Sequence, residues 1–356
     1  MVDPSTAAQG GPLTGQALTL AQPLTNTTTI NDALRLETFD LPSPTPTQVL
    51  VQFLAAPINP LDIHVLRGVY PVKPRHTVRD APIPGFDGVA RVLRIGSAVE
   101  ELQEGNLVIP RSYGLGTWRT HAVLEARDLV RIKRGANVLF AAMLKTVVLP
   151  AYLLVEDMAA LEQGDWVVQN AGTSAIAQAV VQFGRLKGVK SVSVVRDRPG
   201  GTADLAGLAD VVVQESDFDP AEIAKGRNVK LALDSVWGNS ARRIASALGS
   251  GGVFVNYGLL SGGGPESGFQ ITMRDIFFKG TEFRGFRTSA QAAKKGEDEL
   301  EELFGWFLDL FDAKQLRLPK LQEVRWNAQE EQRLVEAVGS VVDMKVNNVK
   351  PVFVFE

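Results

Sequence analysis

Short apolar segments, separated by turns rich in proline and glycine, occupy the first third of the chain. The clearest of them are residues 49–54, 88–93, 107–109 and 117–123. Segments this short, with turn residues between them, are typical of antiparallel strands. The hydrophobic pattern therefore predicts a mostly β unit between residues 17 and 139.

The pattern changes near residue 144, where apolar strands begin to alternate with helical segments. The first helix of this region is expected to stop at Gly188, and its apolar face consists of Ile176, Ala179, Val180, Phe183 and Leu186. Further strands are expected at residues 192–195, 211–213, 231–234 and 253–257. This alternation predicts an α/β fold with a doubly wound parallel sheet.

Ligands of such sheets bind beyond the carboxyl ends of the strands. Residues 234–237 and 257–261 follow two of these strands, and we expect them to face the same cleft as Gly172. The remaining chain predicts helices at 297–312 and 329–343 and a strand at 350–355. We expect this last part to return to the first domain and complete it.

The turn before the first helix of the α/β region has the properties of a dinucleotide site. Small residues let the backbone approach a pyrophosphate, and the helix presents unpaired N–H groups with a partial positive charge. Thr173 and Ser174 can cap this helix. Only Gly172 remains of the usual glycine pattern, because Ala175 and Ala177 stand where glycines are common. A βαβ crossover that binds nothing is therefore the alternative.

Two arginines at the end of the next strand bear on the choice of cofactor. An NAD site usually places a carboxylate there for the ribose hydroxyls, whereas arginine accommodates a 2′-phosphate. Arg196 and Arg198 flank Asp197 at this position, so the sequence predicts NADPH. The alternative is that both arginines are solvated charges at a strand end.

The composition describes a protein large enough for two domains, with 356 residues, 45% of them hydrophobic, and a formal charge of −3. Basic and acidic residues are interspersed, which predicts no nucleic-acid partner. No apolar run is long enough to predict a membrane span. The chain has no cysteine and only 3 histidines, which are well apart, so no metal site is expected.

Residues 1–15 are rich in small and polar residues, and we expect them to form a flexible N-terminal segment. They lack the charged and apolar regions of a secretory signal and the arginines of a mitochondrial transit peptide. These features predict a cytoplasmic protein as the sequence stands. A mitochondrial matrix location stays open for a chain whose leader has been removed.

Four separated motifs narrow the interpretation. They lie at residues 56–74, 114–122, 169–178 and 196–199, and they include Gly-Val-Tyr-Pro at 68–71 and Arg-Asp-Arg-Pro at 196–199. Together they resemble the motifs of the mitochondrial 2-enoyl thioester reductases, over residues 16–356. The resemblance implies a zinc-free medium-chain dehydrogenase/reductase fold. Its GroES-like catalytic domain is expected at 16–143 and 290–356, and its NADP-binding Rossmann domain at 144–289.

The resemblance also implies an activity, the NADPH-dependent reduction of a trans-2-enoyl thioester of coenzyme A or acyl carrier protein in fatty acid metabolism. It implies Tyr70 as the catalytic residue, because a phenol near the thioester can stabilise an enolate or protonate Cα. Relatives form homodimers through the segment that matches residues 280–286. The implied cofactor contacts are Thr173, Ser174, Ala175, Ile176, Arg196, Asp197, Arg198, Tyr257, Gly258, Leu259, Leu260, Phe286, Arg287 and Lys350.

Four residues at three places depart from the family pattern. Val147 replaces an asparagine near the nicotinamide ribose, Arg287 replaces a tryptophan of the acyl pocket, and Phe86-Asp87 replaces Asn-Glu. These changes leave the phosphate contacts in place but leave the substrate open. The other interpretations are an NADPH:quinone reductase, a specialised-metabolite enoyl reductase and an NADPH-binding regulator without turnover.

Overall fold

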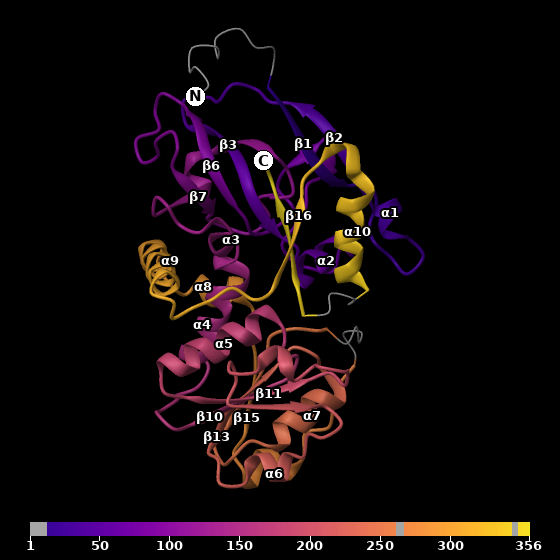
Figure 1. Ribbon diagram of the computed structural model, residues 1–356, viewed down its shortest axis with the longest axis vertical. Helices are drawn as coiled ribbons and strands as arrows, with labels where there is room; N and C mark the ends of the chain where they lie inside the picture. The colour runs from indigo at the N-terminus through magenta and orange to yellow at the C-terminus, as the bar shows by residue number, and fades with distance from the viewer. Residues whose placement is uncertain (1–12, 261–266, 344–347) are drawn as a thin grey trace. The chain divides into compact units, whose positions relative to one another are not determined.

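The computed structural model describes residues 13–260, 267–343 and 348–356. The chain forms two compact units (Figure 1). Unit 1 combines the residues up to Leu144 with those from Lys320 onward, and unit 2 is Lys145–Pro319. Unit 1 is therefore discontinuous in sequence, whereas unit 2 is one uninterrupted stretch.

Unit 1 is built around one large sheet, whose strands are β3 (Gln48–Pro57), β6 (Val89–Ile95), β7 (Leu107–Pro110), β8 (His121–Glu125), β9 (Leu129–Ile132), β16 (Leu321–Arg325) and β17 (Lys350–Val354). The strand order is β16-β17-β3-β6-β7-β9, and β8 pairs with β3 off this path. All neighbours are antiparallel except β16 and β17. The predicted β unit is thus confirmed, and the predicted terminal strand completes it.

Smaller elements surround this sheet. Two short antiparallel sheets pair β1 (Thr14–Leu20) with β2 (Leu34–Asp40) and β4 (Thr77–Val78) with β5 (Ala81–Pro82). The helices of the unit are α1 (Ile30–Ala33), α2 (Pro60–Leu66), α3 (Val138–Ala141) and α10 (Glu331–Val342), with 3₁₀ turns η2 (Ala126–Asp128) and η6 (Ala328–Glu330). Helix α2 begins at a capping box formed by Asn59 and Asp62, with Pro60 at its first position. Tyr70 follows four residues after this helix ends.

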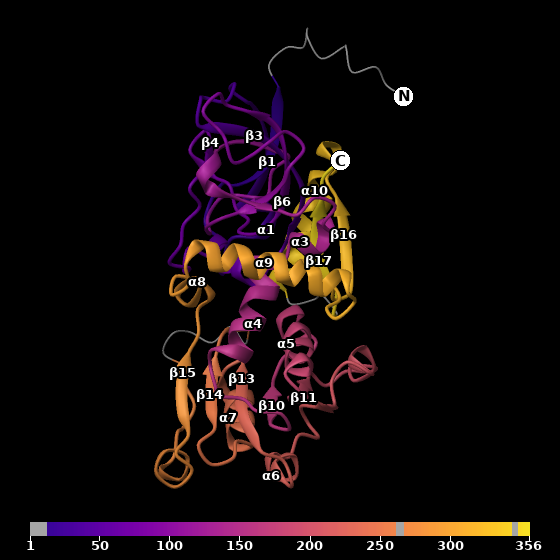
Figure 2. The same cartoon turned by 90° about the vertical axis from the view of Figure 1, so that its left-hand side faces the viewer.

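Unit 2 contains a sheet of six parallel strands: β10 (Trp166–Gln169), β11 (Lys190–Val195), β12 (Val211–Gln214), β13 (Val229–Asp234), β14 (Val253–Asn256) and β15 (Glu282–Gly285). Their order is β12-β11-β10-β13-β14-β15 (Figure 2). Numbered from β10, this is the 3-2-1-4-5-6 order of dinucleotide-binding sheets, which reverses between β10 and β13. The predicted doubly wound sheet is confirmed.

The helices of unit 2 connect these strands or follow the sheet. They are α4 (Leu149–Glu156), α5 (Ala175–Leu186), α6 (Pro220–Ala224), α7 (Gly238–Ser246), α8 (Thr288–Ala292) and α9 (Glu297–Asp312). Two π-helical segments, η3 (Leu144–Val148) and η5 (Arg274–Phe278), and one 3₁₀ turn, η4 (Ala203–Leu205), are also present. The predicted helix after the first strand is α5, and it ends just before Gly188, whose φ is +74°. The helix predicted at 297–312 is α9.

The position of α8 and α9 differs from the expected domain limits. Residues 290–319 were expected in the discontinuous domain, but they cluster with unit 2. The reason is an aromatic cluster, in which Trp306 and Phe307 of α9 pack edge-on or tilted against Tyr152 of α4 and Phe183 of α5, with ring centroids 5.4–6.3 Å apart. These contacts join segments about 120–155 residues apart along the chain.

Candidate active site

The turn after β10 brings the backbone very close to the next strand. A Cβ atom on Gly172 would lie 2.8 Å from the Cβ of Ser193, so only glycine fits there. Ala171 just before it has a φ of +46°, a left-handed conformation that is uncommon for alanine. Ser174 caps α5 by accepting a hydrogen bond from the N–H of Ala177 at 3.3 Å. The N–H groups of Ala175 and Ile176 lie in the first turn of α5, where no carbonyl of the helix can accept from them, so they can bind an anion.

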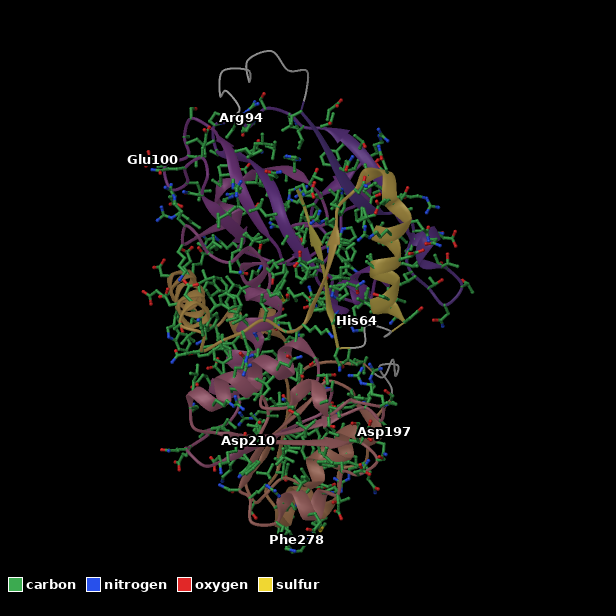
Figure 3. All side chains as sticks on the ribbon, in the orientation of Figure 1. His64, Arg94, Glu100, Asp197, Asp210 and Phe278 are labelled. Atoms are coloured by element: carbon green, nitrogen blue, oxygen red, sulfur yellow. The ribbon has the colours of Figure 1, made fainter. Side chains whose placement is uncertain are left out.

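The predicted phosphate-binding arginines follow β11, which neighbours β10 in the sheet. Arg196 and Asp197 are exposed and Arg198 is half-buried. The Asp197 carboxylate, at the surface of unit 2 in Figure 3, accepts a hydrogen bond from the N–H of Ser216 at 2.9 Å. This hydrogen bond lowers the pKa of Asp197. One oxygen of the carboxylate therefore holds the chain after β12.

The residues after β14 are held against the end of β13. Tyr257 and Leu260 are tied to it, because their N–H groups donate 2.8 Å hydrogen bonds to the carbonyls of Asp234 and Ser235. Burial raises the pKa of Tyr257 to about 12, so its phenol stays protonated, although interactions with the hydroxyls of Ser235 and Ser174 lower this pKa. These hydroxyls, of which those of Ser235 and Tyr257 are shielded from solvent, form a small polar group at the carboxyl edge of the sheet.

Gly258 and Leu259 lie between these anchored residues. A Cβ on Gly258 would meet the Cβ of Ser235 at 3.0 Å, so this loop packs tightly on the end of β13. Phe286 follows β15, is buried, and donates its N–H to the carbonyl of Asn256 at 2.8 Å. Arg287 is exposed and precedes α8 as its N-cap residue. The predicted contact residues of unit 2 therefore all lie at the carboxyl edge of its sheet.

A buried polar network at this edge was not identified from the sequence as a set of contacts. Asp234 at the end of β13 accepts hydrogen bonds from the side-chain amides of Asn170 and Asn256 at 2.6 and 2.7 Å. Asn170 in turn accepts from the N–H of Ser235 at 2.9 Å. The sequence pattern that could have revealed this network is a polar residue at the end of β13 and of β14, and one directly after β10. Residues 234 and 235 thus contact Asn170, two residues before Gly172. That residues 234–237 and 257–261 face one ligand cleft with Gly172 stays a prediction, and Ser261 lies outside the described residues.

Tyr70 and Lys350, the remaining predicted site residues, lie in unit 1. Tyr70 follows α2, its N–H donates to the carbonyl of His64 at 3.2 Å, and its ring packs edge-on against Phe86, with centroids 5.8 Å apart. Lys350 begins β17 and donates from Nζ to the carbonyl of Ile58 at 2.8 Å and to Oδ1 of Asn59 at 2.6 Å. The predicted lysine is therefore fixed beside the start of α2.

Asp62 completes a charged cluster at the start of α2. Its Oδ2 accepts hydrogen bonds from the N–H and side-chain amide of Asn59 at 2.8 and 3.1 Å, whereas its Oδ1 is buried and has no hydrogen-bond partner in the described structure. Burial raises the pKa of Asp62 to about 7, and burial lowers the pKa of Lys350 to about 8. Asp87, which follows Phe86, is also buried and adds a like charge. Sequence analysis did not assign Asp62 a role.

Neither a membrane-spanning helix nor a cluster of metal ligands occurs in the part of the chain that the structure describes. No helix there combines the length and the apolar character needed to cross a bilayer. No group of three or more His, Asp or Glu side chains there could hold a metal ion.

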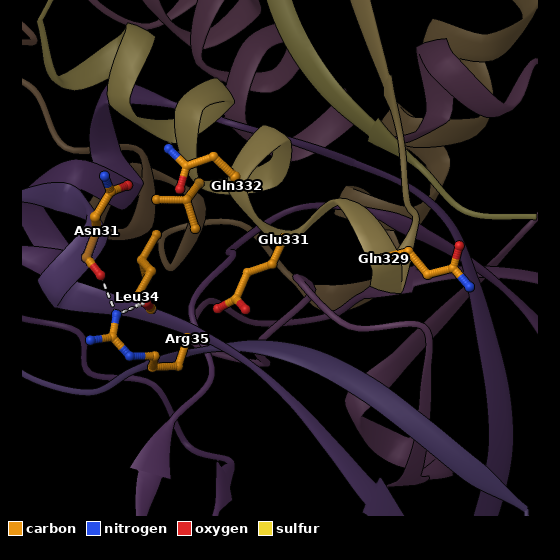
Figure 4. Close-up of a pocket in the computed structure, with 7 residues that line it drawn as sticks. Asn31, Leu34, Arg35, Gln329, Glu331 and Gln332 are labelled. Atoms are coloured by element: carbon orange, nitrogen blue, oxygen red, sulfur yellow. Dashed lines mark hydrogen bonds between the residues drawn. The ribbon is translucent and has the colours of Figure 1, made fainter.

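One open pocket of about 450 Å³ lies in unit 1, away from the residues predicted to act. Figure 4 shows Arg35 directed at the carbonyls of Asn31 and Leu34, and both hydrogen bonds occur within the pocket wall. Glu331 accepts the N–H of Leu36 at 2.8 Å. The charged side chains that line this pocket, Arg35 and Glu331, therefore hold α1, β2 and α10 together.

Fold and site together define a class of protein. Residues 45–134 match the family described as the alcohol dehydrogenase GroES-like domain. Unit 2 has the strand order and the glycine turn of a dinucleotide site. A GroES-like domain joined to such a sheet is the architecture of the medium-chain dehydrogenases/reductases.

Comparisons with known proteins narrow this class. Mitochondrial enoyl-[acyl-carrier-protein] reductase of Caenorhabditis elegans is 35% identical over 287 residues, which cover 77% of this chain and 80% of that protein. The solved complex of Etr1p with NADP and crotonyl-CoA has a TM-score of 0.84 and 28% identity, covering 96% of this chain and 100% of the other. The Etr1p/Etr2p heterodimer of the Candida tropicalis mitochondrial 2-enoyl thioester reductase has the same values. The chain belongs to the family of mitochondrial enoyl-[acyl-carrier-protein] reductases.

Proposed function

We propose that this protein uses NADPH to reduce the C=C bond of trans-2-enoyl thioesters. The observation that carries the proposal is a tight glycine turn after β10 and two arginines after the neighbouring strand β11, at the same edge of the sheet. Gly172 lies against β11 with its N–H donating to the carbonyl of Val194 at 2.9 Å, and Arg196 follows one residue after β11. Membership in the enoyl reductase family supports this reaction, and the solved Etr1p complex contains NADP and crotonyl-CoA.

The residues of unit 2 fit a dinucleotide with an extra phosphate. The free N–H groups at the start of α5, next to Thr173 and Ser174, hold the pyrophosphate. Arg196 and Arg198 hold the 2′-phosphate through charge-assisted hydrogen bonds. The hydroxyls of Ser235 and Tyr257, which lie next to each other and to the hydroxyl of Ser174, supply further polar contacts.

Tyr70 of unit 1 acts on the substrate. When bound, NADPH supplies a hydride to Cβ of the enoyl thioester, and the electron pair of the C=C bond moves toward the thioester oxygen. The phenol of Tyr70 either donates its proton to Cα, which completes the reduction, and regains one from water, or it stabilises the enolate by a hydrogen bond to that oxygen while water supplies the proton to Cα. The edge-on contact with Phe86 holds the ring in place. Lys350 binds the cofactor from the same unit, fixed by Asn59.

The test is NADPH oxidation against a panel of crotonyl-CoA, longer enoyl-CoAs, enoyl-acyl carrier protein and quinones. We expect turnover with the thioesters, and the comparison of the two carriers shows whether acyl carrier protein is a partner. Turnover with quinones alone would replace this proposal by a quinone reductase. Tight NADPH binding without any turnover would replace it by a binding protein.

We also propose that the protein is a homodimer. Strand β15 lies at an edge of its sheet, and five large apolar side chains just before it are exposed: Ile271, Met273, Ile276, Phe277 and Phe278. Phe278 projects from the surface of unit 2 (Figure 3), and 77% of Phe277 and 73% of Phe278 are exposed. An exposed edge strand beside an apolar surface favours pairing with a second copy.

A further inference from the structure

The buried carboxylate of Asp234 has an unusual environment. The side chain is fully buried, and no ion pair of Asp234 occurs within the described structure. Its oxygens accept four hydrogen bonds instead. Oδ1 accepts from Asn170 Nδ2 at 2.6 Å and from the N–H groups of Val236 and Trp237 at 3.1 and 3.0 Å, and Oδ2 accepts from Asn256 Nδ2 at 2.7 Å. Donors on every side compensate for the loss of water.

These hydrogen bonds join three strand ends. Asn170 follows β10, Asp234 ends β13 and Asn256 ends β14, which are consecutive neighbours in the sheet. Asn256 Nδ2 also donates to the carbonyl of Gly258 at 2.8 Å, so the carboxylate is linked to the loop that follows β14. The strand order reverses between β10 and β13, which is where sheets of this type bind dinucleotides. A single side chain thus connects the loops on which the proposed cofactor site is built.

Two of the connected loops contain strained backbone. Ala171, the residue after Asn170, has a φ of +46°. Trp237 has φ +77° and ψ 177°, a region that almost only glycine adopts, and its N–H is bound by Asp234. Strain of this kind persists only when the surroundings hold it.

We propose that Asp234 is a positioning residue for the cofactor site. Its carboxylate holds the turn at 171–174, the turn at 235–237 and the loop at 257–260 in their binding arrangement before the cofactor arrives. The role rests on the proposed NADPH function and adds to it a residue that touches no cofactor itself. Asparagine is a poor replacement, because an NH₂ group in place of Oδ2 would face the Nδ2 donor of Asn256, and in place of Oδ1 it would face three donors.

The chain offers a matched control at the opposite edge of the same strands. Asp165 precedes β10 and accepts from Asn228 Nδ2, just before β13, at 2.6 Å and from the N–H of Glu162 at 2.8 Å. This carboxylate is also buried, and it also joins β10 to β13. It lies at the amino ends of the strands, where no cofactor is expected. Asp165→Asn therefore measures the purely structural cost of the same substitution.

The experiment measures thermal unfolding without cofactor, the dissociation constant of NADPH, and the steady-state KM and kcat of the full chain. We expect Asp234→Asn to weaken NADPH binding about 10- to 100-fold and to raise the KM for NADPH equally, with kcat at saturating NADPH nearly kept. Asn256→Ala, which removes one link, is expected to weaken binding less. Asp165→Asn is expected to lower the unfolding temperature without changing NADPH affinity.

The outcomes separate this inference from the function on which it rests. A wild-type protein that does not bind NADPH would overturn the proposed function. If the wild type binds NADPH but Asp234→Asn and Asn256→Ala bind it equally tightly, the positioning role alone is wrong. Should Asp234→Asn fail to fold, Asn256→Ala decides the question by the same measurement.

Discussion

Asp234 of unit 2 and Asp62 of unit 1 are both buried carboxylates at the end of a structural element, yet their surroundings are opposite. Asp234 has donors at both oxygens. Asp62 has donors at one oxygen, leaves the other without a partner in the described structure, and has its pKa raised to about 7 by burial. The first arrangement fixes the side chain through both of its oxygens, whereas the second allows the charge of Asp62 to change near neutral pH.

This difference matches the division of labour that we propose for the two units. Unit 2 holds a cofactor and needs a rigid set of loops, for which a fully paired carboxylate is suited. Unit 1 carries Tyr70, whose ring contacts Phe86, the residue before Asp87. Asp87 and Lys350 both influence the pKa of Asp62, so titrating groups lie close to the proposed catalytic motif. Substitutions in unit 2 should therefore change cofactor binding, and substitutions in unit 1 should change turnover.

The largest effect is expected from Tyr70→Phe in unit 1. The substitution keeps the ring contact with Phe86 and removes only the hydroxyl. Turnover of the best thioester should fall about 10²- to 10⁴-fold, the range for a positioned acid, while the NADPH dissociation constant stays unchanged. Steady-state kinetics and a binding titration measure the two quantities. Full turnover would reduce Tyr70 to a packing residue.

The converse prediction concerns unit 2. Replacing both Arg196 and Arg198 by alanine should remove most of the preference for NADPH over NADH, because each lost hydrogen bond to the phosphate costs about 1.5–3 kcal/mol. Affinity for NADH should change little. Lys190→Ala, at the other end of β11, is the control. A double variant that keeps its preference would place the 2′-phosphate elsewhere.

A third variant concerns the exposed apolar side chains before β15. Phe277→Asp with Phe278→Asp should convert a dimer into a monomer at micromolar concentration, because charges would have to be buried between the copies. Ile95→Asp, at a half-exposed apolar position of unit 1, should leave the mass unchanged. Light scattering measures the mass. A monomeric wild-type protein would contradict the proposed homodimer.

The smallest effect is expected from Asp62→Asn. The folded-state pKa of Asp62, about 7, lies above the ordinary value of 3.8, so its contribution to stability is present below pH 3.8 and is lost as the pH rises to about 7. Asparagine can keep the Asn59 contacts through its oxygen and does not titrate. The unfolding temperature of the variant should therefore rise relative to the wild type between pH 4 and 7. Parallel curves would show that Asp62 does not titrate in this range.

Local patterns predicted most of the fold. The apolar face from Ile176 to Leu186 and the stop at Gly188 belong to one helix, and α5 has these limits within two residues. The sequence motifs also placed the candidate residues at strand ends. The prediction that they bind NADPH and substrate stays a prediction.

Contacts between distant residues could not be predicted in the same way. The hydrogen bonds between Asn170, Asp234 and Asn256 depend on the register of three strands, and nothing local in the sequence fixes that register. The grouping of α9 with unit 2 depends on ring contacts with Tyr152 and Phe183, far away in the chain. Asp62 was overlooked because its raised pKa comes from burial, which a helix-capping pattern does not reveal.

The discontinuity of unit 1 has a consequence for synthesis on the ribosome. Every residue of unit 2 leaves the ribosome before β16 and β17 do, since both strands follow Pro319. Strand β17 then has to enter between β16 and β3, a strand made about 300 residues earlier. Residues 48–52 of β3 pair with β8 on this side, so only residues 55–57 wait unpaired there, for roughly 15–60 seconds at the usual rate of about 5–20 residues per second. Nascent chains stalled before residue 320 should therefore contain a protease-resistant unit 2 and a protease-sensitive unit 1.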